Sequence, residues 1–148
     1  MQPTHATSDM PWAEARIGKQ RIKGAYAWRT MLDHHIPLAG GSDFPVEQVP
    51  PILGIYAAVT RQDAKGMPAG GWYPAQRMTL SEAIDAFTRG AAYAEGAEDT
   101  RGMIAVGRRA DLTVFSGTLA PDRSLLDLHV DTTIVDGEIV YQREQASR

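Results

Sequence analysis

The stretch IPLAGGSDFPVE, residues 36–47, decides how the rest of the chain is interpreted. Residues 36–41 are apolar and bounded by proline and glycine, which is typical of a buried strand that runs into a loop. Asp43 follows directly in a glycine-rich turn. Loops at the carboxyl ends of parallel strands form the active sites of α/β folds, so Asp43 is the first candidate for a catalytic carboxylate. The alternative is an aspartate that only caps the turn through its side-chain oxygens.

On both sides of this stretch the spacing of apolar residues predicts helices. Pro51 suits the first position of a helix. Thr79 and Glu82 form the pattern of a capping box, and Gly96 is a suitable C-cap for the helix that this box opens. Polar or glycine- and proline-rich stretches between the helices predict loops. We expect helices over residues 25–35, 52–60 and 79–96, and loops over residues 2–9 and 62–76.

After about Thr100 the apolar period falls to two, which indicates strands. Asp136-Gly137 lies between two such runs and is a strong signal for a hairpin. Strands are expected at residues 103–106, 111–115, 133–135 and 138–141. The chain therefore combines an α/β region with an all-β region, and neither region looks complete by itself.

Composition excludes several classes of protein. The 148 residues include 15 lysines and arginines and 18 aspartates and glutamates, a formal net charge of −3, which gives no electrostatic reason to expect a nucleic acid or a membrane surface as partner. Cysteine is absent, which excludes disulfide scaffolds, thiolate metal sites and cysteine nucleophiles. No apolar stretch approaches the ~20 residues of a membrane span. Residues 1–5 lack the features of a signal peptide, so a cytoplasmic location is expected.

Other side chains that could take part in chemistry are few. His5 and Asp9 lie four residues apart, so the carboxylate could orient the imidazole for ligand binding, the alternative being an exposed terminal histidine. Trp12 could line a pocket or pack in a core. Histidines 34 and 35 suit the end of a helix, and His129 suits a solvated strand face. His-x-His, His-Glu-x-x-His, a phosphate-binding glycine loop and a Gly-x-Ser-x-Gly elbow are all absent from the sequence.

Several stretches, in the same order, resemble the metal-dependent amidohydrolase superfamily, and in particular its branch of N-substituted formamide deformylases. They are MQPTHATSD (1–9), RIKGAYAWR (21–29), LAGGSDFPVE (38–47), GRRADLTVF (107–115) and DGEIVY (136–141). The resemblance covers essentially residues 1–141 and implies the C-terminal part of a (β/α)8 TIM-like barrel plus part of the family's β-sandwich. Residues 1–98 would be an incomplete barrel, residues 99–141 a segment of the sandwich, and residues 142–148 a tail.

The resemblance also implies a reaction, the hydrolysis of C–N bonds of the amide or formamide type at a divalent metal centre, with zinc as the expected ion. A bound metal lowers the pKa of its water toward ~7, and a neighbouring carboxylate can accept the proton. Asp43 matches the aspartate of the family's eighth strand, and is expected to be both a catalytic residue and a metal ligand. His5, Asp9 and Trp12 are expected to contact the substrate.

The family's other metal ligands come from earlier strands, and this chain resembles the family only from about the seventh strand. We therefore expect a fragment of the enzyme that is inactive alone. Two alternatives stay open: a small subunit that completes a split barrel with a partner or with copies of itself, and a non-enzymatic module that binds a small molecule. Because the apolar faces of residues 52–59 and 80–87 need a cover, a homo-oligomer or a missing N-terminal part is also expected.

Overall fold

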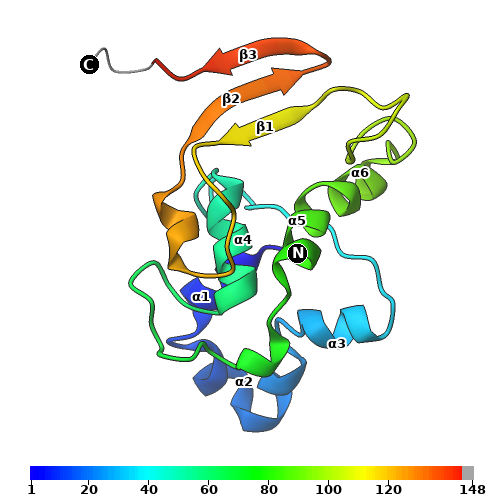
Figure 1. Cartoon of the computed structure of the whole chain (residues 1–148). Helices are drawn as coiled ribbons and strands as arrows, with labels where there is room; N and C mark the ends of the chain where they lie inside the picture. The colour runs from blue at the N-terminus through cyan, green and yellow to red at the C-terminus, as the bar shows by residue number, and fades with distance from the viewer. Residues whose placement is uncertain (145–148) are drawn as a thin grey trace.

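The computed structural model describes residues 1–144 of the chain, as a helical part and a three-stranded sheet that lies at the top of Figure 1. The helices are α1 (Pro3–Asp9), α2 (Ala13–Arg21), α3 (Trp28–Asp33), α4 (Pro51–Thr60), α5 (Leu80–Phe87) and α6 (Arg89–Glu95). Short 3-10 helices are η1 (Ile22–Gly24), η2 (Pro74–Gln76) and η3 (Arg123–Asp127). The strands are β1 (Leu112–Phe115), β2 (Val130–Val135) and β3 (Glu138–Gln142). The predicted tail begins inside β3, and its residues 145–148 lie outside the described residues.

Helix α4 is the centre of the helical part. Pro51 opens it, and residues 54–60 are all buried, because the helix is apolar on nearly every side. Arg61 ends it in the left-handed conformation. Ile55, Tyr56 and Val59 join a core to which α1, α3 and α5 also contribute. The predicted helix over residues 52–60 is therefore confirmed.

The helix predicted over residues 79–96 is present but divided. The capping box is formed in full, since Glu82 N donates to Thr79 Oγ1 at 3.3 Å and Thr79 N donates to Glu82 Oε2 at 2.7 Å. Gly96 ends α6 with φ of 74°, as expected for a C-cap. Thr88, with φ of −122° and ψ of −85°, separates α5 from α6. The prediction of one continuous helix was wrong at this residue.

The loop predicted over residues 2–9 is instead the helix α1. Pro3 occupies a favourable position at its start, and Ala6 is fully buried in the core. The polarity of this segment predicts a loop, but packing against α4 stabilises a helix. Helix α2 was also not predicted, because the glycine at position 18 disfavours a helix. In the structure Gly18 has φ of 82° and interrupts α2.

The prediction of a buried strand at residues 36–41 was wrong, because these residues form no strand and Ile36 is exposed. They make one parallel contact, in which the N-terminal amine of Met1 donates to Ala39 O at 2.5 Å and Gly41 N donates to Met1 O at 3.0 Å. This alternation of bonds on the two sides of one residue is the pattern of a parallel ladder. We call this pair of hydrogen bonds the parallel bridge. The paired strands within residues 1–144 are all antiparallel, and these residues close no barrel.

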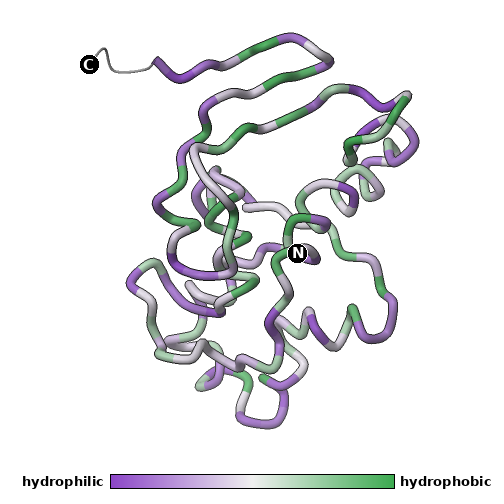
Figure 2. The backbone as a smooth tube through the Cα atoms, in the orientation of Figure 1, coloured by the Kyte–Doolittle hydropathy of each residue, from purple (hydrophilic) through white to green (hydrophobic). Residues whose placement is uncertain are grey.

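The sheet is antiparallel, with the order β1-β2-β3. Asp136 and Gly137 both have positive φ, 53° and 86°, as a two-residue hairpin turn requires. The hairpin is therefore confirmed, whereas the strand predicted at residues 103–106 is not formed. Figure 2 shows hydrophobic residues along all three strands as well as in the helical part. No helix within residues 1–144 is long and apolar enough to cross a membrane.

Candidate functional site

Asp43 lies directly after the parallel bridge, at the start of a tight turn. Val46 N donates to Asp43 O at 2.8 Å, which closes the turn. Asp43 has φ of 58°, a left-handed conformation that aspartate tolerates better than most residues. Its side chain is 52% exposed. The turn therefore presents the carboxylate to solvent instead of using it as a buried cap.

His5 is the side chain that the fold brings to Asp43. Its Nε2 lies 3.8 Å from Asp43 Oδ2, and its side chain is 23% exposed. This separation is too long for a hydrogen bond but short enough for electrostatic attraction when the imidazole is protonated. The cause is the bridge between Met1 and residues 39–41, which places the start of α1 beside the turn of Asp43. Nε2 of His5 is buried and has no hydrogen-bond partner within the described part of the chain.

Asp9 has a different partner from the one that the sequence suggested. The hydroxyl of Tyr26 donates to Asp9 Oδ2 at 2.5 Å. Burial and this hydrogen bond raise the pKa of Tyr26 to about 12. Within residues 1–144 no hydrogen bond joins Asp9 to His5. Asp9 therefore fixes the C-terminal end of α1 to the loop before α3, and does not orient the imidazole.

The remaining candidates lie on the surface. Trp12, at the N-cap of α2, is exposed. Two cavities of about 980 and 190 Å³ are lined by residues other than Trp12, His5 and Asp43. His34, His35 and His129 are exposed as well, as expected for surface residues. Substrate contact by Trp12 stays a prediction.

A metal ion needs more donors than this site offers. Within residues 1–144 there is no group of three or more histidine, aspartate or glutamate side chains that could hold one. Structural zinc is bound by four protein ligands and catalytic zinc usually by three. Asp43 and His5 supply one carboxylate and one imidazole. These residues alone therefore do not form a metal site.

The side chain that holds the backbone of Tyr26 in place is Arg61, which the sequence patterns did not indicate as important. Arg61 Nη1 donates to Tyr26 O at 3.0 Å, and Arg61 Nε donates to Trp72 O at 2.8 Å. The guanidinium carbon lies 4.5 Å from the ring centre of Trp28 and 5.2 Å from that of Trp72. No short-range pattern signals this cluster, because the residues that Arg61 contacts lie 11 to 35 positions from it along the chain.

Comparisons with known proteins place the chain in a family. The model of the amidohydrolase family matches residues 1–141. YtcJ of Bacillus subtilis (strain 168), whose name proposes an amidohydrolase, is 40% identical over 145 residues, which are 97% of this chain but 27% of YtcJ. An uncharacterized metal-dependent hydrolase from Pyrococcus furiosus has a TM-score of 0.61 and 32% identity over 74% of this chain and 21% of that one. A second, from Pyrococcus horikoshii OT3, has a TM-score of 0.64 and 29% identity over 74% of this chain and 22% of that one.

The chain thus spans about a quarter of the length of the curated relative and about a fifth of the solved hydrolases. The two hydrolases are described as metal-dependent, which supports a divalent metal in the family. The family match extends from Met1, which forms the parallel bridge, through the turn of Asp43 to the final hairpin. With residues 1–141 matched, this chain belongs to the amidohydrolase family.

Proposed function

We propose that this chain is the part of a metal-dependent amidohydrolase that supplies Asp43 to the active site. The observation that carries the proposal is the approach of His5 Nε2 to Asp43 Oδ2 at the end of the parallel bridge, in a chain that matches the family over residues 1–141. The complete enzyme would have a (β/α)8 barrel, to which residues 1–98 contribute, and a β-sandwich, to which residues 99–141 contribute.

The chemistry offered by these residues is proton transfer by a carboxylate. Asp43 is exposed enough to meet a substrate, and it can accept a proton from an attacking water as a general base. An oxygen and a nitrogen donor are both of kinds that zinc binds, but two donors do not hold the ion. We therefore propose that this chain is inactive alone and that the other ligands come from outside residues 1–144.

The proposed substrates are amides and N-substituted formamides, and the proposed metal is zinc. The substrate class is supported by the ordered stretches that resemble the formamide deformylase branch, above all GSDFPVE at residues 41–47. His5 is the best-supported substrate contact, because it lies beside Asp43. Asp9 and Trp12 are proposed as further contacts.

The test is a chimera in which residues 1–141 replace the matched segment of YtcJ. We would measure formate release from N-benzylformamide and acid release from N-acyl amines, together with bound metal by elemental analysis. The chimera is expected to hydrolyse one of these substrates with added zinc, whereas the 148-residue chain alone is not. Asp43→Asn should lower the rate at least ~100-fold, as loss of a general base does, and should also lower the metal content.

Asp33→Asn is the matched control, because Asp33 is an exposed aspartate on α3 whose ion pair with Arg29 is a surface contact. It should leave both the rate and the metal content unchanged. Metal-dependent turnover by the isolated chain would contradict the proposal, as would an active chimera that is indifferent to Asp43→Asn.

A second proposal is that the chain is a small subunit that completes a split amidohydrolase with a separate polypeptide. A large uncovered apolar cavity between the helices and the sheet favours it. The chemistry assigned to Asp43 is the same in both proposals, and they differ only in whether one chain or two form the enzyme. A cytoplasmic location also stays a prediction.

A further inference from the structure

His5 and Asp9 lie one turn apart on the same face of α1. Residues at positions i and i+4 of a helix are neighbours, with Cβ atoms about 5–6 Å apart. His5 Nε2 approaches Asp43 Oδ2 at 3.8 Å. One turn later, Asp9 Oδ2 accepts a hydrogen bond from the hydroxyl of Tyr26 at 2.5 Å. A contact that fixes Asp9 therefore also fixes the direction in which the side chain of His5 points.

The position of α1 is set by its neighbours, because the helix has little to hold it in isolation. It is seven residues long, and isolated helices of this length are unstable in water. The side chain of Gln2, at its N-cap, makes no capping hydrogen bond. The parallel bridge holds the start of the helix, and the burial of Ala6 beside α4 holds its middle. The C-terminal end is left to Asp9.

His5 has no hydrogen bond of its own that could replace this support. Its Nε2 is buried and finds no hydrogen-bond partner among residues 1–144. The distance to Asp43 is too long for a direct bond. The approach of the imidazole to the carboxylate therefore depends on the contacts that place α1.

Tyr26 is held on both its backbone and its side chain. Arg61 Nη1 donates to the carbonyl oxygen of Tyr26 at 3.0 Å, and Arg61 is fully buried at the end of α4. The ring centre of Tyr26 lies 5.7 Å from that of Trp72, to whose carbonyl oxygen Arg61 also donates. Burial and the bond to Asp9 raise the pKa of Tyr26 to about 12, so the hydroxyl keeps its proton at neutral pH and acts as the donor.

The bond between Tyr26 and Asp9 is of a strong kind, since hydrogen bonds to an ionised carboxylate are shorter and about twice as strong as those between neutral groups. It involves only the hydroxyl of Tyr26, whereas Arg61 binds the backbone oxygen of the same residue. Removal of the hydroxyl therefore releases the end of α1 without disturbing the contact with Arg61.

We propose that Tyr26 is a positioning residue of the candidate active site, because its hydroxyl, through Asp9, holds the face of α1 that directs His5 toward Asp43. Tyr26 itself touches no reacting atom and acts through His5. The inference rests on the proposed function, in which His5 contacts the substrate and Asp43 accepts the proton. A tyrosine that only stabilises the fold is the other outcome of the tests.

The first test is NMR spectroscopy of the 148-residue chain, in which the ring resonances of His5 are assigned with His5→Gln. In the unchanged chain, Asp43→Asn should shift these resonances, because it removes a charge 3.8 Å from Nε2. In Tyr26→Phe, the same substitution should produce less than about half of that shift, because the electrostatic effect of Asp43 falls as the imidazole moves away.

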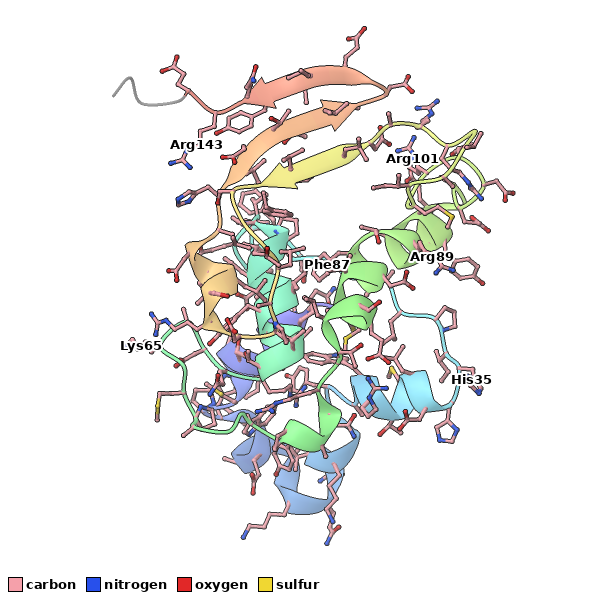
Figure 3. All side chains as sticks on the ribbon, in the orientation of Figure 1. His35, Lys65, Phe87, Arg89, Arg101 and Arg143 are labelled. Atoms are coloured by element: carbon pink, nitrogen blue, oxygen red, sulfur yellow. The ribbon has the colours of Figure 1, made fainter. Side chains whose placement is uncertain are left out.

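Tyr73→Phe is the matched control, because the hydroxyl of Tyr73 makes the same kind of bond, at 2.9 Å, to Glu14 Oε2 on α2. It should leave the response of His5 to Asp43→Asn unchanged. His35 is an internal control, since it is exposed and lies in Figure 3 just beyond α3, on the opposite side of the helical part from α1. Its resonances should not respond to Asp43→Asn.

Three results would overturn the proposal. The first is a full response of His5 in Tyr26→Phe, and the second is an equal loss of response in Tyr73→Phe. The third is a His5 that shows no response to Asp43→Asn in the unchanged chain, since it would then not lie beside Asp43.

The second test is kinetic and uses the YtcJ chimera. Tyr26→Phe should lower kcat/KM at least about tenfold, because small displacements of a positioned group are costly. In a chimera that already has His5→Gln, Tyr26→Phe should lower kcat/KM no further, because its effect passes through His5. An equal loss in both backgrounds would assign Tyr26 to the stability of the fold and would overturn the proposal.

The two tests separate this inference from the proposed function. A chimera that hydrolyses no amide or formamide contradicts the proposed function, while the NMR response of His5 still decides on Tyr26. A chimera that hydrolyses its substrate with an unchanged kcat/KM after Tyr26→Phe contradicts only the positioning role.

Discussion

Arg61 is fully buried, although within residues 1–144 no carboxylate forms an ion pair with it. Burial lowers the pKa of its guanidinium to about 10, so it remains charged at neutral pH. The charge is accommodated by the carbonyl oxygens of Tyr26 and Trp72 and by the faces of two indole rings. Through Tyr26 the same side chain supports the hydrogen bond to Asp9 at the end of α1.

Arg61→Ala should lower the free energy of unfolding by about 3 kcal/mol, because it leaves buried carbonyl oxygens without a donor and creates a cavity. The measurement is urea denaturation followed by tryptophan fluorescence. Arg89→Ala is the control, since Arg89 makes only an exposed ion pair with Asp85 and should lose less than ~0.5 kcal/mol. Equal stabilities for the two variants would show that the Arg61 cluster contributes nothing to the fold.

Glu82 combines the capping box with a two-pronged ion pair to Arg29, whose Nη1 lies 2.9 Å from Glu82 Oε1. The hydrogen bond from Arg29 is the largest cause that lowers the pKa of Glu82, from 4.5 to about 2. Because the pKa of Glu82 is lower in the folded state than in the unfolded state, its ionised carboxylate stabilises the protein at pH values above the unfolded pKa. This stabilisation is lost as the pH falls from about 4.5 toward about 2.

Glu82→Gln keeps the hydrogen bonds of the capping box but removes the charge that pairs with Arg29. It should therefore lower the free energy of unfolding by about 1 kcal/mol at pH 7, the upper end for a partly exposed ion pair. The difference from the unchanged chain should shrink below pH 4.5 in thermal unfolding measured at a series of pH values. Asp85→Asn, on the same helix, removes an exposed ion pair and should show little change at any pH. A difference that stays constant down to pH 3 would argue against the ion pair as the cause.

At the scale of elements, α4 and α5 are held together by a close approach of Phe87 to glycine. A Cβ atom added at Gly54 would lie 2.4 Å from Cζ of Phe87, and one added at Gly40 would lie 2.8 Å from the same ring. Glycine inside a helix is normally unfavourable, so its presence in α4 reflects this contact. The ring thereby links α4 and α5 to the extended stretch that precedes Asp43.

Gly54→Ala should destabilise the protein by about 1–3 kcal/mol, the usual cost of overpacking, although alanine is the better helix former. Gly24→Ala is the matched control, because a Cβ atom there meets nothing within 4 Å. Calorimetry on both variants measures whether Gly54→Ala loses more stability than Gly24→Ala. Adding Phe87→Leu to Gly54→Ala should recover part of the loss, and no recovery would mean that the ring is not the obstacle.

At the scale of the whole molecule, the described residues contain no group of three metal ligands. A ligand that binds only the folded state raises the melting temperature, by an amount that grows with the logarithm of the ratio of its concentration to its Kd. We therefore expect neither zinc nor a chelator to shift the melting temperature of the 148-residue chain, whereas a chelator should lower that of the YtcJ chimera. The measurement is differential scanning fluorimetry with zinc and then EDTA, and a zinc-dependent rise for the chain alone would contradict the expectation.

The sequence alone was sufficient for several interactions that join residues close together in the chain. The capping box of Thr79 and Glu82, the C-cap at Gly96 and the turn at Asp136-Gly137 each involve a few consecutive residues, and all are formed as predicted. The order of the stretches that contain GSDFPVE and GRRADLTVF was sufficient for the superfamily, which the match over residues 1–141 confirms. Asp43 could also be predicted as a candidate catalytic residue from its local position, directly after the apolar residues 36–41.

Only the tertiary structure decided the features that depend on distant partners. Residues 3–9 are a helix because α4 buries Ala6. Residues 103–106 are not a strand because a strand needs a partner that residues 1–144 do not provide. The approach of His5 to Asp43 depends on a bridge between Met1 and residues 39–41, and the Arg61 cluster on carbonyl oxygens up to 35 residues away. Local sequence patterns contain no information on such contacts, because their energy is gained only when packing brings the partners together.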